Sequence, residues 1–243
     1  MRAGQSPAAG PKVFPILKHR RQIQNHPSIA AEDDWMLWQL ADSAFPAGGF
    51  AHSGGLEAAW QHGEVRSASE LAALLESSLR QLGQASLPFV GAAFDDPGQL
   101  VALDEWCDAF LTNHVANRAS RLQGRAFLSS AEKIFPGRHV VRPRCGHFAP
   151  IFGATARAVG LERSRAARLF LFLHLRGLIG AAIRLGIVGP MEGQALQHRF
   201  SSVASEVLAQ CDALTVAEAA QTAPLLEIWQ ATQDRLYSRL FQS

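Results

Sequence analysis

The sequence has few cysteines, few charged residues and no secretory signal. Cys107, Cys145 and Cys211 are widely separated and odd in number, which excludes a disulfide framework and favours a reducing compartment. The N-terminus has no apolar run of the kind that directs secretion, so we expect a cytoplasmic protein. Charged residues make up 18% of the chain, below the roughly 25% typical of soluble proteins, which indicates that partners cover some surface.

Acidic residues are absent from the first part of the chain. Five basic residues precede the first acid, Glu32, whereas the rest of the chain has 18 basic and 21 acidic residues. The basic pI of about 8.6 therefore belongs to a tail and is poor evidence for a nucleic-acid partner. We predict a disordered basic tail over residues 1–33; an organelle transit peptide is the alternative, because the segment holds Arg and no acid.

An uninterrupted apolar run is also missing. The most apolar stretch, Ala166 to Val188, approaches the length of a membrane span but contains Arg168, Arg176 and Arg184. Each arginine at the centre of a span costs about 2.5–3.5 kcal/mol, so we predict a buried helix and no membrane partner.

The motifs of nucleotide and acyl-transfer enzymes do not occur. The sequence has no G-x-x-x-x-G-K-[ST], G-x-S-x-G or H-E-x-x-H, so we predict that the protein is not an enzyme, with no catalytic residue and no cofactor. Cys145 and His147 can meet one metal ion, but a closed site usually takes four ligands. The neighbouring Arg138, Arg142 and Arg144 also disfavour a cation, so we predict no metal site.

The residues that start and end helices recur along the chain, and the sequence has no alternating strand pattern, repeat or heptad series. Ser67 to Glu70 form a capping box ahead of a leucine stripe, Ser164 is placed to cap the long apolar helix, and Pro224 opens a last helix that reaches residue 243. We predict an all-α fold, a single-domain orthogonal bundle of roughly nine helices over residues 34–243.

Residues 38–57 are the most informative stretch. Pro46 and the following glycines fix a turn, and Ser53 is placed to cap the next helix, which by itself indicates a helix–turn–helix corner. His52 lies beside Phe50, however, among glycines that let another backbone approach closely. This chemistry suits a contact surface.

This stretch resembles the N-terminal signature of the urease accessory protein UreF family. The similarity continues in order along the chain, through residues 123–125, 147–153, 175–186, 189–190 and 236–243. Two positions depart from the family pattern. Many bacterial members have Tyr at position 52, whereas this chain has His, which resembles the plant-type sequences. Gln233-Asp234 replaces a common His-Glu pair.

The resemblance implies an all-α homodimer without catalytic activity. Such a protein is a chaperone of nickel insertion in urease maturation: it assembles with UreD (also called UreH) and the GTPase UreG on apo-urease, and it modulates GTP-dependent nickel delivery. Partner contact would then fall on the signature residues Phe50, His52, Ser53 and Glu57.

The C-terminal end carries Tyr237, Leu240 and Phe241 with no Gly or Pro to fix a helix cap. Such an end usually frays, and apolar side chains are costly to leave in water. We hypothesise that it becomes ordered on binding UreD/UreH, with Arg239 making a charge-assisted hydrogen bond there. Ordinary core packing of Leu240 and Phe241 is the alternative.

Small residues in the long apolar helix favour a second contact. Gly177 and Gly180 allow short distances between helices, and Arg176 and Arg184 need carboxylate or carbonyl partners if buried. This pattern indicates either a dimer interface or a central core helix. Two other functions stay open: an all-α enzyme with a small pocket near His52 and Glu57, and a helical scaffold unrelated to urease.

Overall fold

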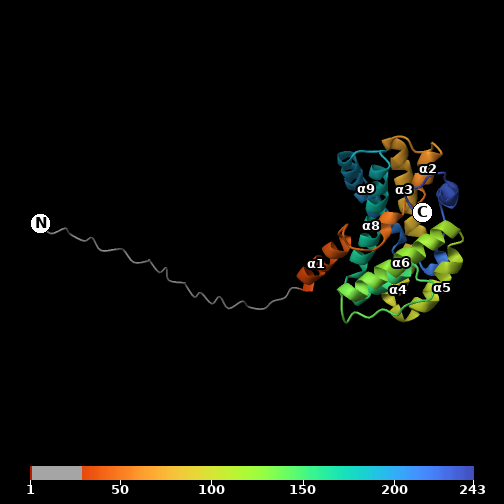
Figure 1. Ribbon diagram of the computed structural model, residues 1–243. Coiled ribbons are helices and arrows are strands. Elements are labelled where there is room, and N and C mark those ends of the chain that lie inside the picture. Colours follow the sequence, from red (N-terminus) through yellow and green to blue (C-terminus); the bar gives the residue numbers. More distant parts are fainter. Residues whose placement is uncertain (2–28) are drawn as a thin grey trace.

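The computed structural model describes Met1 and residues 29–243, with side chains from residue 34 onward. The described part contains helices and no strand, which confirms the all-α prediction (Figure 1). The predicted tail lies almost wholly outside the described residues, and the first helix begins at residue 29. The α-helices are α1 (Ile29–Ala41), α2 (Leu56–Gln61), α3 (Ala68–Ala85), α4 (Leu87–Asp95), α5 (Leu100–Phe110), α6 (His114–Ile134), α7 (Phe148–Ala158), α8 (Arg163–Arg184), α9 (Pro190–Cys211) and α10 (Pro224–Thr232). Short 3₁₀ helices cover η1 (Gly49–Ala51), η2 (Pro97–Gln99), η3 (Val216–Glu218) and η4 (Gln233–Arg235).

Local capping explains where α3 begins. The Ser67 hydroxyl accepts a hydrogen bond from the Glu70 main-chain N–H at 3.3 Å, and the Glu70 carboxylate accepts one from the Arg66 N–H at 2.8 Å. This hydrogen bond from Arg66 is the main reason that the pKa of Glu70 lies below its usual value. The predicted N-cap at Ser67 is therefore confirmed, whereas the main-chain N–H that Glu70 accepts is that of Arg66 and not that of Ser67.

Two predicted helix ends are wrong. The long apolar helix α8 begins after Glu162 rather than at a Ser164 cap. The last helix ends at Thr232, and the chain from residue 236 to 243 is irregular instead of helical. The main-chain N–H groups of Leu240 and Phe241 donate to the side chain of Glu57, so they are not available for helical hydrogen bonds.

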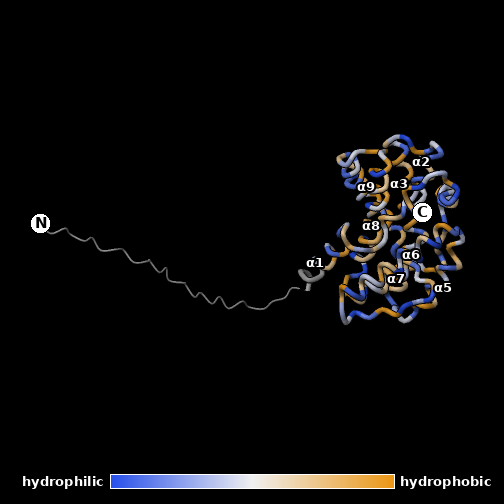
Figure 2. Tube along the Cα trace, in the orientation of Figure 1, coloured by the Kyte–Doolittle hydropathy of each residue, from blue (hydrophilic) through white to orange (hydrophobic). Residues whose placement is uncertain are grey.

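The core joins two groups of helices. In one, α8 packs against α9 and both contact α3; in the other, α7 is enclosed by α4, α5 and α6 (Figures 1 and 2). Aromatic side chains connect α6, α7 and α8, with neighbouring ring centroids 5.2–5.7 Å apart. The rings belong to Phe127, Phe148, Phe152 and Phe170. Offset and tilted ring pairs at these distances are favourable, so this cluster fixes how the two groups meet.

Among the described residues, α8 is the one helix with the length and apolar composition to cross a membrane. In its most apolar window, 56% of the residues are buried inside the fold. That burial is the pattern of a core helix, as the arginines in its sequence predict.

Two glycines in helices occupy opposite environments and give a paired stability test. A Cβ on Gly153 of α7 would lie 2.2 Å from the Val90 carbonyl oxygen of α4, whereas a Cβ on Gly177 of α8 would meet nothing within 4 Å. We expect Gly153→Ala to lower the free energy of unfolding by about 1–3 kcal/mol through overpacking. Gly177→Ala should raise it by about 0.5–1 kcal/mol, because alanine favours the helix. Urea denaturation of both variants would check this; equal effects would contradict the packing.

His174 of α8 is a half-buried, hydrogen-bonded residue beside the core, in keeping with its apolar surroundings in the sequence. Its Nε2 lies 2.7 Å from the Ser78 hydroxyl of α3, and burial lowers its pKa from 6.5 to about 4.

As the pH is lowered from 6.5 to 4, His174 takes up a proton in the unfolded chain before it does so in the folded chain. The free energy of unfolding should therefore fall over this range. The loss is at most about 3 kcal/mol. Thermal unfolding of the wild type and His174→Gln across this range measures it. The variant should show a flatter dependence on pH, and identical slopes would contradict the assignment.

Candidate functional site

The two signature stretches meet around one buried carboxylate. Glu57, in the first turn of α2, is 1% exposed. Its Oε1 accepts a hydrogen bond from the Leu240 N–H at 2.6 Å, and its Oε2 accepts from the Phe241 N–H at 3.1 Å and from Gln233 Nε2 at 2.6 Å. Three neutral donors thus satisfy the carboxylate. We call this unit, residues 48–57 with residues 233–243, the terminal junction.

Main-chain pairing extends the terminal junction beyond Glu57. The Gln242 N–H donates to the Ala51 carbonyl at 2.8 Å, and the Ser53 N–H donates to the Ser243 oxygen at 2.5 Å. The Ser53 hydroxyl also donates to that oxygen, at 3.1 Å. The predicted capping role of Ser53 is confirmed in part: Gly55 is the N-cap of α2, but the Ser53 hydroxyl accepts a hydrogen bond from the Glu57 N–H at 3.4 Å. The fully buried Ser53 also holds the C-terminal segment.

The glycines of the signature stretch permit this close approach. Gly54 and Gly55 have φ values of +60° and +89°, a region that other residues rarely adopt. A Cβ on Gly55 would also lie 3.1 Å from the main-chain nitrogen of Gln230 in α10. The glycines therefore let the signature stretch lie directly against the C-terminal part of the chain.

Arg184 of α8 joins both halves of the junction. Its guanidinium carbon lies 3.8 Å from the centroid of the Phe50 ring and 4.1 Å from that of the Phe241 ring, and its Nη1 donates to the Phe50 carbonyl at 2.6 Å. A guanidinium between two ring faces makes favourable cation–π contacts with both. Arg184 is thus held by contacts within the chain, and its place in a dimer interface stays a prediction.

His52 occupies the edge of the junction. Its Nδ1 lies 2.6 Å from the Ser243 hydroxyl. Burial, with a smaller contribution from the positive charge of Arg118, holds the pKa of His52 below its usual value. The ring is therefore neutral at pH 7 and acts as a hydrogen-bonding group.

The junction also presents apolar side chains to solvent. Tyr237 is fully exposed, Phe50 is 78% exposed and Leu240 is 52% exposed. Phe241, by contrast, is buried, so the core-packing alternative is confirmed for Phe241 and wrong for Leu240.

The fraying hypothesis also needs correction. The end of the chain is held by Glu57 and Ser53 without any partner, and Arg239 already pairs with Asp234 at 3.0 Å.

Asp234 is a charged centre that the sequence did not reveal. Its carboxylate binds Arg118 of α6 through two hydrogen bonds, of 2.8 and 3.0 Å, and lies 3.5 Å from His114 Nε2. The hydrogen bonds from Arg118 are the main reason that the pKa of Asp234 lies below its usual value. The departure from the family pattern at Gln233-Asp234 is the one sequence feature that could have pointed to this centre. Gln233 binds Glu57 within the core, and Asp234 pairs with Arg118, Arg239 and His114 at the surface.

The other predicted interface residues lie along α8. Arg176 donates to the Ala41 carbonyl at the end of α1, and its guanidinium stacks over the Phe172 ring at 5.7 Å. Gly177 and Gly180 face open space. Arg176 is thus satisfied within the chain, and the glycines leave a bare strip on this helix.

Two cavities in the described part of the chain lie away from His52 and Glu57. The larger cavity, of about 710 Å³, lies between α3, α9 and α10, and the second, of about 550 Å³, lies along α6; neither is lined by these two residues. One group of possible metal ligands lies elsewhere in the described part of the chain: Asp108, Cys145 and His147.

Fold and site together define an all-α protein whose two signature stretches form one hydrogen-bonded unit. The profile of the UreF family matches residues 65–201. Urease accessory protein F of Arabidopsis thaliana is 39% identical over 86% of this chain and 92% of its own length. The Oryza sativa subsp. indica protein of the same name is 37% identical over 91% and 90%, and UreF of Sinorhizobium medicae is 30% identical over 82% and 92%. The chain belongs to the UreF family.

Proposed function

We propose that this protein is an accessory factor of urease maturation that acts by binding other proteins and has no catalytic activity of its own. Family membership supports the role, since the relatives carry the name urease accessory protein. Its partners are a UreD/UreH protein, the GTPase UreG and apo-urease, and through them it modulates GTP-dependent nickel delivery. The proposal includes a cytoplasmic location and no nucleic-acid or membrane partner.

The observation that carries the binding role is the rigid display of apolar groups at the terminal junction. Tyr237, Phe50 and Leu240 are exposed, yet the segments that carry them are tied to the buried Glu57 and Ser53. A main chain that is fixed before binding lowers the entropy cost of forming an interface, and exposed aromatic residues often dominate binding energy. The surface therefore suits a UreD/UreH partner.

Capture by the tagged full-length chain tests this role. We expect the wild type to retain both the UreD/UreH and UreG homologues of its own organism. Deletion of its gene should abolish urease activity, and the intact gene should restore it. Full urease activity in the deletion strain would contradict the proposal.

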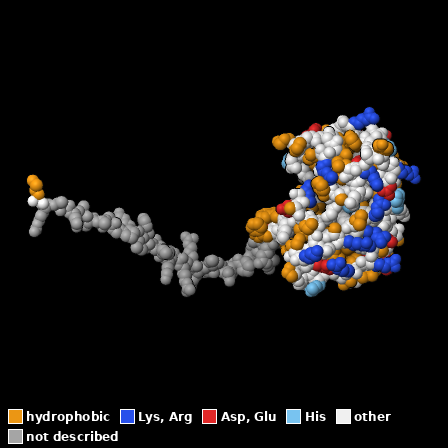
Figure 3. All heavy atoms as spheres, viewed as in Figure 1, with side chains coloured by type: hydrophobic (Ala, Val, Ile, Leu, Met, Phe, Trp, Pro, Cys, Tyr) orange, Lys and Arg blue, Asp and Glu red, His pale blue; other side chains and the backbone are white. Residues whose placement is uncertain are grey.

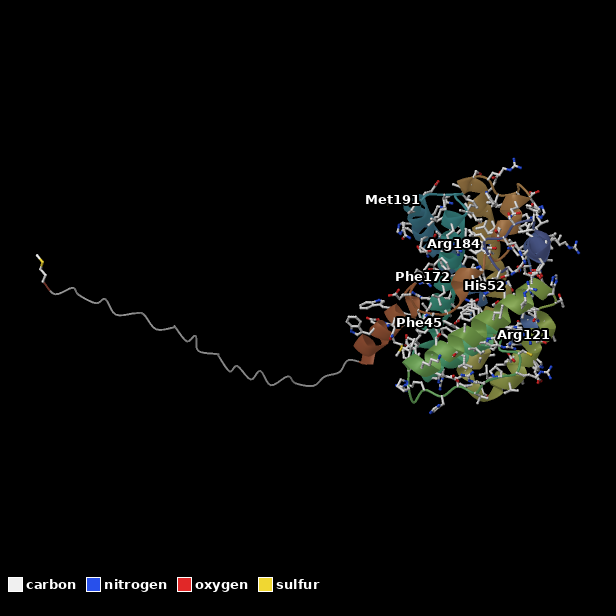
Figure 4. The ribbon with its side chains drawn as sticks, viewed as in Figure 1. Phe45, His52, Arg121, Phe172, Arg184 and Met191 are labelled. Atoms are coloured by element: carbon white, nitrogen blue, oxygen red, sulfur yellow. The ribbon has the colours of Figure 1, made fainter. Side chains whose placement is uncertain are left out.

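A dimer interface along α8 is a second element of the proposal. The bare strip at Gly177 and Gly180 adjoins Phe172, which is 38% exposed, and α1 packs beside α8 with Trp35 and Trp38 exposed at 71% and 57%. Figure 3 shows hydrophobic side chains gathered at α1, and Figure 4 shows Arg184 and Phe172 along the same side of the molecule. Such an apolar face fits a second copy of the chain.

Gly180→Arg should therefore produce a monomer in analytical ultracentrifugation, because the new side chain fills the strip. It should leave the fold intact, since nothing in the chain lies within 4 Å of a Cβ there. Val101→Arg, at a half-exposed position on α5, is the control and should stay dimeric. A monomeric wild type, or a dimeric Gly180→Arg protein, would contradict the interface.

A further inference from the structure

Three metal-ligand types converge beside α5, away from the terminal junction. Asp108 lies on α5, and Cys145 and His147 lie in the loop that leads into α7. One ligand atom of each lies within 4.8 Å of the others, and His147 Nε2 is 3.0 Å from Asp108 Oδ1. Ligand atoms around one ion are separated by about 3–4 Å, so small side-chain movements suffice to place an ion among them.

A buried carboxylate holds the loop in place. Asp104, which is fully buried, accepts hydrogen bonds from three successive main-chain N–H groups, those of Cys145 at 2.8 Å, Gly146 at 3.0 Å and His147 at 2.7 Å. This clasp fixes the positions of the thiol and the imidazole before any ion arrives. Preorganisation of this kind lowers the cost of binding.

The surroundings of His147 suit a ligand. Its Nδ1 lies 3.1 Å from the Ser120 hydroxyl, which can donate to the ring or accept from it. Without an ion, Nε2–H donates to Asp108; with an ion, the proton moves to Nδ1 and donates to Ser120, so the ring need not turn.

Two of the three arginines that argued against a metal, Arg138 and Arg142, are placed otherwise than their sequence positions indicate, whereas the positive charge of Arg144 does act on Cys145. Arg142 pairs with Glu132, and Arg138 is exposed. Of the nearby cations, Arg121 lies 3.8 Å from Asp108 Oδ1 and is itself partly exposed, so it can move toward solvent. Arg121 and Asn117 both contact Asp108 and line the 550 Å³ groove along α6, so the groove borders the residues around Asp108.

We propose that Asp108, Cys145 and His147 bind one divalent transition-metal ion of intermediate softness, of the class of Ni²⁺, Co²⁺ and Zn²⁺. Sulfur, nitrogen and oxygen donors together favour this class over Mg²⁺ or Ca²⁺. The Cys145 thiol releases its proton to solvent as the sulfur–metal bond forms. In a tetrahedral site, three protein ligands would leave one coordination position open. This site does not depend on the partner-binding role.

Cobalt titration of the full-length protein tests the site. We expect one Co²⁺ per chain and a sulfur-to-cobalt charge-transfer band. Cys145→Ser should abolish the band, whereas Cys211→Ser, a buried cysteine on α9, should keep it. A wild type without the band, or a band lost in Cys211→Ser or Cys107→Ser but kept in Cys145→Ser, overturns the proposal.

Calorimetry with Ni²⁺ provides a second measurement with gentler variants. Asp108→Asn keeps an oxygen that can accept the hydrogen bond from Asn117, but the side chain is no longer charged. This variant should bind Ni²⁺ at least tenfold more weakly. Ser120→Ala should weaken it about 10–100-fold, as loss of an outer-shell partner typically does. Circular dichroism confirms that each variant is folded. Unchanged Ni²⁺ affinity in the folded Asp108→Asn protein would overturn the proposal.

Discussion

Replacing Glu57 by alanine is expected to release the C-terminal segment and to lower the free energy of unfolding by at least about 3 kcal/mol. The substitution removes the acceptor of the Leu240 N–H, the Phe241 N–H and Gln233 Nε2, all in the core of the terminal junction. Each buried donor left without a partner costs about 1–3 kcal/mol, so the segment gains by moving into water. Limited proteolysis should then cleave within residues 236–243, and urea denaturation should give the loss of stability.

Two control variants separate the hydrogen bonds from a general effect. Glu57→Gln keeps one acceptor oxygen but places an NH₂ group where the other oxygen accepted a hydrogen bond. We therefore expect the free energy of unfolding to fall by about 1–2 kcal/mol. Glu64→Ala, at an exposed position just after α2, should change nothing. If Glu57→Ala were as stable and as protease-resistant as Glu64→Ala, the carboxylate would not hold the junction.

The second large effect is expected from Tyr237→Ala in partner binding. Tyr237 is fully exposed, so its loss should leave the stability of the free chain unchanged. At an interface, a central aromatic residue contributes about 2 kcal/mol or more, which corresponds to roughly 30-fold weaker binding. Surface plasmon resonance with the purified UreD/UreH homologue measures this change.

A matched variant on another surface is the control for Tyr237→Ala. Leu225, at the start of α10, is 60% exposed and lies outside the terminal junction. Leu225→Ala should bind the UreD/UreH homologue as the wild type does. If Tyr237→Ala also bound at wild-type strength, the exposed face of the junction would not be the contact surface.

Features determined by neighbouring residues could be predicted from the sequence. The start of α3 follows from Ser67 and Glu70, which lie three residues apart and satisfy each other locally. The all-α class and the buried α8 follow in the same way from helical periodicity and from arginines inside an apolar run. The family signatures at both ends were also recognisable, because the order of residues carries them.

Features that depend on distant residues could not be predicted. The segment 236–243 is not helical, since the N–H of Leu240 is bound by a carboxylate 183 residues earlier in the chain. Arg184 has a helical pattern typical of an interface, and only the fold reveals the two aromatic rings that enclose it. Asp108 lies 39 residues from His147, so the third metal ligand had no local signal.

Amide hydrogen exchange in the free protein, without any partner, tests the central claim most directly. The claim is that the C-terminal segment is already docked on the signature stretch, through Glu57, Ser53 and Ala51. We predict that the N–H groups of Leu240 and Phe241 exchange at least about 100-fold more slowly than in an unstructured peptide. Exchange of both amides at the unstructured rate would contradict the account and would mean that the segment becomes ordered only on binding.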